Sequence, residues 1–311
     1  MKEERLVSVL MPCYREDISF FCDAVNSVLN QTYTNWELLL ILDDPNNLEL
    51  KKKANEFVAL DKRVKILENK KNMGIVDSLN NAIDYANGLF IARLDADDIA
   101  MTNRIEEQMK YIDDYDMIST NFSFINMEGN VIRERKFPSE ERKLKHYLRE
   151  IADCMYHTTW LLKKDMYIQL GKYRNVGPFE DYDFILRGIK EGYRVYNIPD
   201  ILCYYRYNVT GISSKNKVYQ HLGSEYLRDN YERIDEIDSN EILNYLETDL
   251  AKYKKAEYEK FVYWKKKIFD SNNTLNFTIK IIAYGLFITL FNYYGRKKVI
   301  DWFKEVYMIF L

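Results

Sequence analysis

Four short apolar runs alternate with amphipathic stretches over the first 95 residues, and this alternation constrains the fold more than any other feature. The runs are predicted as buried strands and span residues 6–11, 36–42, 64–67 and 89–94. Helical spacing of apolar residues lies between them, at residues 18–29, from about 47 to 60, and at 74–86. This order is typical of a parallel sheet covered by helices on both faces. We therefore predict an α/β fold with a mostly parallel central sheet.

Polar clusters follow three of these predicted strands. They are Tyr14-Arg15-Glu16-Asp17, Asp43-Asp44 and Asp95-Ala96-Asp97-Asp98. Ligands of such sheets bind outside the carboxyl ends of the strands, so we expect the three clusters to converge. The first strand is not followed by G-x-G-x-x-G or by a P-loop, which excludes those two phosphate-binding motifs.

The third cluster places three carboxylates within four residues at the end of a buried strand. Clustered carboxylates repel one another, so such a cluster favours a bound cation. Asp95 and Asp97 on one loop would hold Mn²⁺ or Mg²⁺ and leave coordination positions open for phosphate oxygens. Other D-x-D sequences, at 114–116 and 181–183, do not follow an apolar strand. The structural alternative is an acidic start to the helix predicted from Asn103.

Two further polar features near these strand ends are candidates for ligand contacts. Asp43 and Asp44 would accept hydrogen bonds from a nucleotide base or ribose, and the alternative is an Asx turn before Pro45. Arg93 lies inside an apolar strand, where an unpaired charge is costly. We expect a carboxylate or phosphate partner for it, or else a position at the sheet edge where its charge reaches water.

Later in the chain, two sites carry residues with acid–base or metal chemistry. Glu180 and Asp181 begin a helix predicted over 179–189 and would supply a general base, although acids also favour helix starts for electrostatic reasons. His157 lies on a strand predicted over 157–162. It is either a metal or acceptor contact or a buried, hydrogen-bonded histidine, and the second reading is favoured.

The remaining pattern predicts a mixed second half and a helical tail. Strands are predicted at 117–124, 131–135, 194–197 and 202–207, and helices at 103–113 and 142–152. Long charged helices follow from about 214 to 270, which gives domains at 1–212 and 213–311. The apolar run 281–291, flanked by Lys280 and by basic residues 296–298, is short for a membrane span. It predicts an interfacial membrane segment or a helical hairpin packed on the core.

Composition and cysteine spacing indicate the class of partner and the cellular compartment. The net charge of −3 gives no support for nucleic-acid binding. Four cysteines without C-x-x-C spacing predict reduced thiols in a cytoplasmic protein. The N-terminal residues lack the apolar core and cleavage site of a signal peptide.

Several ordered blocks between about residues 5 and 210 together resemble one family, the family 2 inverting glycosyltransferases with a GT-A fold. The blocks are Val7–Tyr14, Ser27–Tyr33, Trp36–Asp44, Asn72-Met73-Gly74, Ala92–Asp98 with Arg104 and Gln108, and Glu180–Asp183. Two departures affect contacts with the donor base. Pro45-Asn46-Asn47 follows Asp43-Asp44 where the family often has Gly-Ser, and Arg15 stands where Asn is common.

The resemblance implies a UDP- or GDP-sugar donor, a Mn²⁺ or Mg²⁺ cofactor and roles for individual residues. Asp97 would be the firmer metal ligand, with Asp95 and His157 as further ligands. Asp181 would be the catalytic base, with Glu180 as the alternative. The residues expected to contact the donor are Pro12, Tyr14, Glu16, Asp43, Asp44, Asn72, Gly74, Arg93 and Asp95.

The expected function is transfer of a sugar to a lipid-linked glycan in surface polysaccharide synthesis, by a cytoplasmic protein peripheral to the inner membrane face. One alternative is a metal-dependent nucleotidyltransferase. That class should carry a basic, Gly-rich loop after the first strand, and Pro12-Cys13-Tyr14-Arg15 does not resemble one. The other is an inactive nucleotide- or glycan-binding module, against which the retained acids argue. The sequence does not predict the oligomeric state.

Overall fold

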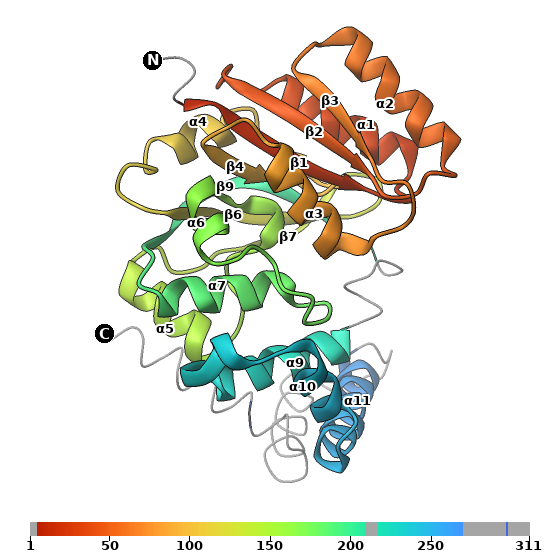
Figure 1. The fold of residues 1–311 in the computed structure, drawn as a ribbon. Helices are drawn as coiled ribbons and strands as arrows, with labels where there is room; N and C mark the ends of the chain where they lie inside the picture. Colours follow the sequence, from red (N-terminus) through yellow and green to blue (C-terminus); the bar gives the residue numbers. More distant parts are fainter. Residues whose placement is uncertain (1–4, 209–216, 270–296, 298–311) are drawn as a thin grey trace. The chain divides into compact units, whose positions relative to one another are not determined.

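The computed structural model describes residues 5–208, 217–269 and 297, and it divides into two compact units (Figure 1). The first unit comprises the described residues of 1–145, 153–175 and 180–211. The second comprises those of 146–152, 176–179 and 212–311, so the boundary falls within helix α5 (Glu141–Glu150).

The described strands of the first unit form one sheet in the order β3-β2-β1-β4-β8-β6-β9-β5, with β7 paired to β6. The strands are β1 (Val7–Cys13), β2 (Trp36–Leu42), β3 (Val64–Glu68), β4 (Phe90–Arg93), β5 (Ile99–Ala100), β6 (Met117–Ile125), β7 (Val131–Arg135), β8 (Leu161–Lys163) and β9 (Val195–Arg206). The long pairings β1–β2, β2–β3, β1–β4 and β6–β9 are parallel, whereas the short strands β5, β7 and β8 pair antiparallel. The predicted mostly parallel α/β sheet is confirmed.

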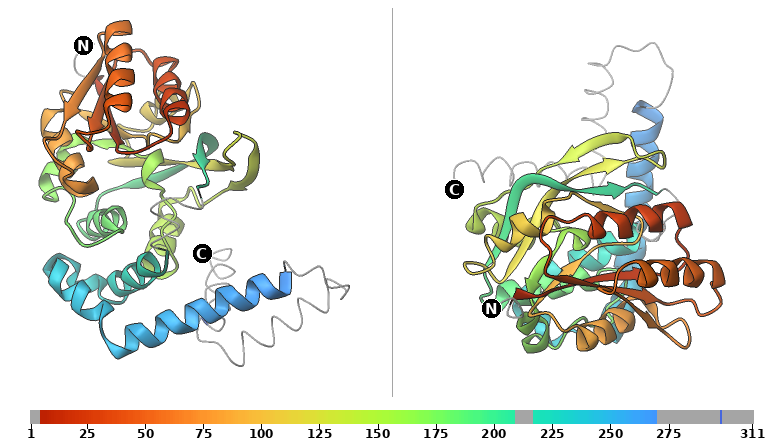
Figure 2. Two further views of the ribbon diagram at one scale, coloured as in Figure 1. Left: turned by 90° about the vertical axis from the view of Figure 1, so that its right-hand side faces the viewer. Right: turned by 90° about the horizontal axis from the view of Figure 1, so that it is seen from above.

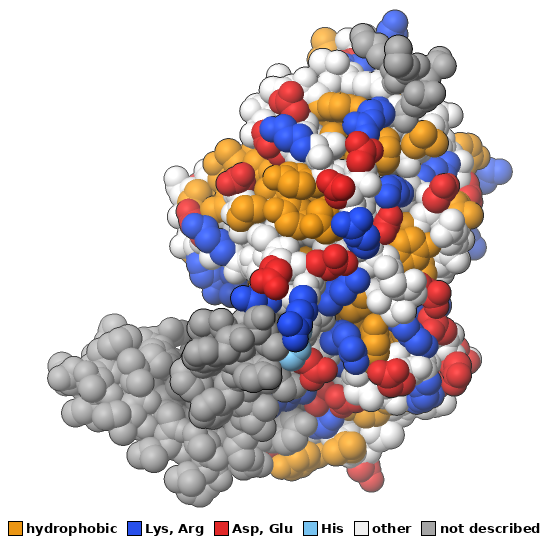
Figure 3. Space-filling model, turned by 90° about the vertical axis from the view of Figure 1, so that its left-hand side faces the viewer, with side chains coloured by type: hydrophobic (Ala, Val, Ile, Leu, Met, Phe, Trp, Pro, Cys, Tyr) orange, Lys and Arg blue, Asp and Glu red, His pale blue; other side chains and the backbone are white. Residues whose placement is uncertain are grey.

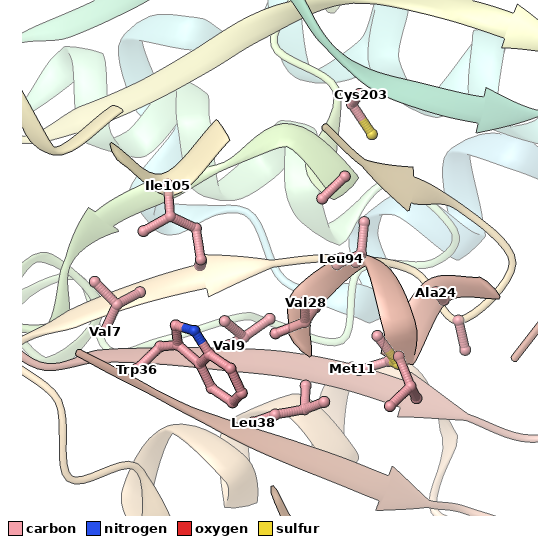
Figure 4. Packing of buried hydrophobic residues seen from close by; sticks show 14 of the residues in the cluster. Val7, Val9, Met11, Ala24, Val28, Trp36, Leu38, Leu94, Ile105 and Cys203 are labelled. Carbon is pink, nitrogen blue, oxygen red and sulfur yellow. The ribbon is translucent and has the colours of Figure 1, made fainter. Parts of the chain in front are cut away.

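Helices cover both faces of this sheet, as the alternating pattern predicted. They are α1 (Ile18–Leu29), α2 (Leu48–Leu60), α3 (Gly74–Tyr85), α4 (Arg104–Met109), α6 (Lys164–Gln169), α7 (Glu180–Lys190) and the single-turn 3₁₀ helix η2 (His157–Thr159). Helices α1 and α2 share a core with alternate residues of β1 and β2, and α3 packs on the opposite face of these strands (Figures 1 and 2). In Figure 4, Ala24 and Val28 of α1 lie against Val9 and Met11 of β1.

Local sequence explains why α1 begins where the pattern predicted. The Asp17 carboxylate accepts a hydrogen bond from Ser19 N at 2.8 Å and so satisfies one of the free amides of the first turn. Four apolar side chains on one face of the helix are fully buried, which fixes the face that meets the sheet: Phe21, Ala24, Val25 and Val28.

The structure corrects the predicted elements at several points. The predicted strand 157–162 is instead η2 followed by β8, because Trp160 N bonds to His157 O and turns the backbone. The strands predicted at 194–197 and 202–207 are one strand, β9, whose pairing with β6 shifts register near Asn121. Ile75, an apolar residue in the first turn of α3, is exposed. Helix α6 and strand β5 were not predicted.

The second unit is helical in its described part, as the sequence predicted for this region. Its helices are α9 (Lys217–Asp229), η3 (Tyr231–Glu236), α10 (Ser239–Leu246) and α11 (Asp249–Phe269). Glu225 is buried and forms ion pairs with Lys254 and Lys297 at 3.1 and 2.8 Å, which lower the pKa of Glu225 to about 2 against the opposing effect of its burial.

The apolar run 281–291 lies outside the described residues, so neither reading of it is tested. Within residues 5–208, 217–269 and 297, no helix has the length and apolar character needed to cross a bilayer. The face of the molecule in Figure 3 carries lysine and arginine side chains interspersed with aspartate and glutamate, in keeping with the small net charge.

Candidate active site

The three polar clusters predicted to converge follow neighbouring strands of the first unit. Strand β1 lies between β2 and β4, with Cys13 opposite Leu42 and Leu10 opposite Arg93. The backbone continues these pairings past the strand ends, since Asp43 N bonds to Cys13 O at 2.9 Å. The residues after β1, β2 and β4 therefore share one edge of the sheet.

The turn after β4 is fixed at its first carboxylate. Arg93 is 1% exposed and donates to Asp95 Oδ1 and to Leu10 O, both at 2.7 Å. Thr158 Oγ1 accepts a hydrogen bond from Asp95 N at 3.1 Å, and Asp98 N closes the turn on Asp95 O. Arg93 therefore has the carboxylate partner that its position in an apolar strand predicted.

The second carboxylate, Asp97, is partly exposed and forms no ion pair with a described residue. Burial raises the pKa of Asp97 to about 7, and the nearby carboxylates of Asp95 and Glu16 add to the rise. A divalent cation would relieve this repulsion, so the donor set fits one. Residues 5–208, 217–269 and 297 contain no group of three His, Cys, Asp or Glu side chains that could enclose a metal.

The third acid of the turn, Asp98, is fully buried and serves the backbone. Its Oδ1 accepts a hydrogen bond from Arg206 N at 2.8 Å. Burial, followed by the charges of Asp97 and Asp95, raises the pKa of Asp98 well above its usual value. These acids do not cap the next helix, because α4 begins only at Arg104.

A second group of acids begins α7. Burial raises the pKa of Glu180 to about 8 and that of Asp181 to about 6, and the charge of Asp181 adds to the rise at Glu180. Asp183 differs, because its carboxylate accepts from Arg187 Nε at 2.9 Å and from Arg174 Nε at 3.1 Å. Asp183 is therefore neutralised within the protein, while Glu180 and Asp181 are not.

The turn after β4 and the start of α7 influence one another electrostatically. The negative charge of Asp95 raises the pKa of both Glu180 and Asp181, and the positive charge of Arg93 lowers both. Glu180 and Asp181 therefore lie within electrostatic range of both Arg93 and Asp95.

His157 lies beside Arg93 in a part-buried hydrogen-bond network. Its Nε2 accepts from Arg93 Nε at 3.2 Å and lies 2.6 Å from the Tyr173 hydroxyl, which is 2.7 Å from the Tyr167 hydroxyl. Burial, followed by the Arg93 charge, lowers the pKa of His157 well below its usual value and keeps the ring neutral. These contacts favour a hydrogen-bonded histidine; a metal-ligand role for His157 stays a prediction.

The residues predicted around the donor base form a second network after β1 and β2. Glu16 accepts from Tyr14 N at 2.6 Å, and Arg15 Nε donates to Asp44 Oδ2 at 3.0 Å while its guanidinium lies over the Tyr14 ring. Asp44 Oδ1 also accepts from Asn46 N at 3.1 Å, so the Asx turn suggested as the alternative is present. Pro12 lies within β1, one residue before Cys13.

Asp43 has its carboxylate occupied by protein donors. Its Oδ1 accepts from Asn69 Nδ2 and Met73 N at 2.7 Å, and its Oδ2 from Gly74 N at 2.9 Å. Gly74 has a φ of +79°, which favours glycine, and its N–H is shared with Asn72 Oδ1 at 3.0 Å. Asp43 thus holds the loop before α3, and direct donor contacts of Asp43, Asn72 and Gly74 stay predictions.

Sequence reasoning missed three side chains that support this site. They are Thr158, Tyr173 and Arg206. Arg206 ends the apolar run of β9, and a charge in an apolar strand was the signal that singled out Arg93, so the same test would have found it. Thr158 and Tyr173 carried no comparable signal.

The comparisons with known proteins identify the family. The sequence profile described as "Glycosyl transferase family 2" matches residues 8–171. The O-antigen biosynthesis glycosyltransferase WbnJ of Escherichia coli is 31% identical over 229 residues, which cover 72% of this chain and 88% of WbnJ. The Escherichia coli protein WfgD, named as a UDP-Glc:alpha-D-GlcNAc-diphosphoundecaprenol beta-1,3-glucosyltransferase, is 40% identical over 128 residues, covering 41% of this chain and 46% of WfgD.

Solved structures agree on the fold. GalNAc-T7, crystallised with UDP, GalNAc and Mn²⁺, superposes with a TM-score of 0.58 at 18% identity over 73% of this chain and 49% of its own. TarS of S. aureus in complex with UDP gives a TM-score of 0.54 at 16% identity, covering 81% and 78%. The chain belongs to glycosyl transferase family 2 and is a glycosyltransferase with a GT-A fold.

Proposed function

We propose that the protein transfers a sugar, with inversion at the anomeric carbon, from a UDP- or GDP-sugar to a hydroxyl of a lipid-linked glycan in bacterial surface polysaccharide synthesis. The observation that carries the proposal is a pair of acids that no lysine or arginine of the described residues neutralises, Asp97 on the turn after β4 and Asp181 at the start of α7. The pKa of each is raised by burial and by the charge of Asp95. Asp97 would bind a cation, and Asp181 would accept a proton.

The relatives support the substrate classes. The name of WfgD contains a UDP-sugar donor and a diphosphoundecaprenol-linked acceptor, and WbnJ is named for O-antigen biosynthesis. GalNAc-T7 and TarS were crystallised with UDP. A lipid-linked acceptor would require the protein to work at a membrane surface, which we place at the cytoplasmic face.

The donor side would be formed by the residues after β1, β2 and β4. Tyr14 and Asp44 would contact the base and ribose, and Asp43 would hold the loop before α3 in place. Asp97 and Asp95 would hold Mn²⁺ or Mg²⁺ together with diphosphate oxygens of the donor. When bound, the cation would neutralise the charge that builds on the leaving diphosphate.

The acceptor side would be formed by α7. Asp181 would take the proton of the acceptor hydroxyl while that oxygen bonds to the anomeric carbon, and the bond from this carbon to the donor phosphate breaks. The nucleoside diphosphate leaves with the bonding electrons, on the face opposite the attack. Burial raises the pKa of both acids, and the charge of Asp181 raises that of Glu180 further, so Asp181 is the acid that would ionise first and serve as the base.

A thermal-shift screen of UDP-, GDP-, dTDP- and CMP-sugars, each with and without Mn²⁺, tests the donor class. We expect a UDP- or GDP-sugar to raise the melting temperature only when Mn²⁺ is present. Slow Mn²⁺-dependent hydrolysis of the same sugar would show an active enzyme and exclude an inactive binding module. A protein that no nucleotide-sugar stabilises would contradict the proposal.

A further inference from the structure

Arg206, the last residue of β9, is a buried arginine beside the turn after β4. It is 3% exposed, and its guanidinium forms an ion pair with Asp23 Oδ2 at 3.4 Å. Burying a guanidinium is costly unless its donors are satisfied. Here carbonyl oxygens satisfy most of them, because Arg206 donates to the main chain of two separate loops.

One of these loops is the turn that carries Asp97. Arg206 Nε donates to Asp97 O at 2.9 Å, and Arg206 N donates to Asp98 Oδ1 at 2.8 Å. One residue therefore holds two consecutive residues of the turn, one through its side chain and one through its backbone. Asp98 accepts the second of these bonds from a buried position, which gives this third acid a structural task.

The same guanidinium is fixed at two other places in the first unit. It contacts the turn between β6 and β7 through Asn126 O and Met127 O, each at 3.3 Å, and it lies over the Phe20 ring of α1 at 4.0 Å. Asp23 lies one turn further along α1. The turn after β4 is thereby tied to a helix and a hairpin that both belong to the sheet scaffold.

The two arginines of this turn act on different atoms. Arg93 pairs with the carboxylate of Asp95, whereas Arg206 binds the carbonyl of Asp97 and leaves the Asp97 carboxylate free. An arginine bound to that carboxylate would compete with a cation. We propose that Arg206, together with Asp98, is a positioning residue that presents the Asp97 carboxylate to a divalent cation.

This inference rests on the proposed function, in which Asp97 binds the cation of a nucleotide-sugar. Groups that orient a metal ligand typically contribute about 10- to 100-fold to metal affinity. Replacing Arg206 should therefore weaken cation binding by about that factor while leaving the Asp97 side chain itself in place.

The test is a Mn²⁺ titration of the full chain in the presence of UDP, with free Mn²⁺ followed by electron paramagnetic resonance. We expect Arg206→Met to raise the apparent Kd for Mn²⁺ by about 10- to 100-fold, and Arg206→Lys, which keeps one donor, to fall in between. Arg63→Met is the matched control: Arg63 also lies over an aromatic ring, that of Trp36, but precedes β3 at the opposite end of the sheet. It should bind Mn²⁺ like the wild type.

Asp98 provides a second pair of variants should Arg206→Met fold poorly. Asp98→Ala removes the acceptor of Arg206 N, whereas Asp98→Asn keeps an oxygen in that position. The inference requires the alanine variant to bind Mn²⁺ more weakly than the asparagine variant. Equal affinities for Mn²⁺ in wild type and a folded Arg206→Met, or in the two Asp98 variants, would overturn it and leave the proposed function intact. A wild-type protein that binds no Mn²⁺ with UDP would overturn both.

Discussion

The two ends of the central sheet treat buried acids in opposite ways. Glu37, near the amino end of β2, accepts from the Ser8 hydroxyl at 2.7 Å and from the backbone and side chain of Asn87 at 2.7 and 2.9 Å. It also pairs with Lys65 at 2.7 Å. These donors overcome the effect of its burial and lower the pKa of Glu37 to about 2.

At the carboxyl end, Asp97 has no such set of donors, and burial raises its pKa to about 7. The two acids therefore act on stability with opposite sign. Glu37 contributes stability above pH 4.5 that is lost as the pH falls toward 2. Asp97 without a cation loses stability as the pH rises from 3.8 toward 7, because the folded state holds a proton that the unfolded state releases.

This difference separates acids that build the fold from acids available for chemistry. Where protein donors hold both carboxylate oxygens, as at Glu37 and Asp183, the protein itself already neutralises the carboxylate. Where burial leaves a carboxylate short of donors, as at Asp97, Glu180 and Asp181, a cation or proton from outside would complete it. Perturbed acids of this kind gather at functional sites.

The largest effect should follow from Asp97→Asn. We expect sugar transfer, measured as nucleoside diphosphate release, to fall by at least about 10³-fold, because several kcal/mol of charge stabilisation depend on the cation. In metal-free buffer at pH 8 the variant should melt at a higher temperature than the wild type, since the partly buried charge is gone. Asp114→Asn, in a D-x-D that does not follow a strand, is the control and should keep full activity. Normal turnover by Asp97→Asn would place this acid with Glu37 among the structural ones.

The next largest effect should come from Asp181→Asn. Loss of a general base costs about 10²- to 10⁴-fold, so transfer should fall within that range while Mn²⁺-dependent nucleotide binding persists. Glu180→Gln, which alters the protonated neighbour, should reduce transfer less. If Glu180→Gln is the more severe change, Glu180 is the base.

A smaller effect, on stability alone, is expected at the other end of the sheet. Glu37→Gln replaces a charged acceptor by an amide that cannot accept from all of these donors. The shift of its pKa from 4.5 to about 2 corresponds to about 3 kcal/mol. Urea unfolding at pH 7 should show a loss of that order, and transfer at a temperature where the variant is folded should be unchanged. A loss of activity in folded Glu37→Gln would contradict the assignment of Glu37 to a purely structural role.

The sequence predicted much of the fold where each element has its own local signal. The apolar run of β2 and the capped, amphipathic α1 both begin and end at the predicted residues. Prediction failed where tertiary pairing decides the backbone. Thr158 and Thr159 favour a strand by propensity but form a 3₁₀ turn, and the strands predicted separately at 194–197 and 202–207 form one strand, β9, across a register shift.

The convergence of the acidic clusters was predictable because parallel strands bring their carboxyl ends to one edge. The different roles of the individual acids were not predictable. Asp43 and Asp44 are adjacent and identical in residue type, yet the carboxylate of Asp43 is occupied by backbone amides of the loop before α3. Asp97 and Asp98 are adjacent, yet only Asp98 serves the backbone of β9. Such differences depend on donors contributed by distant segments, which no local pattern contains.

The smallest effect is expected in the pH dependence of transfer, which tests the difference between the acids at the two ends of the sheet. A base must be ionised, and burial raises the pKa of Asp181 to about 6. At saturating Mn²⁺ and donor, kcat should therefore rise about tenfold per pH unit below 6 and level off above it.

The same profile distinguishes the two acids of α7. If Glu180 were the base, the rise would continue to about pH 8, the value to which burial and the charge of Asp181 raise its pKa. A conservative change at the other end of the sheet, Glu37→Gln, should leave the profile in place, because Glu37 is ionised throughout this range. A flat profile between pH 5 and 8 would mean that neither acid accepts the proton in the slow step, and the uncompensated burial at α7 would then need another explanation.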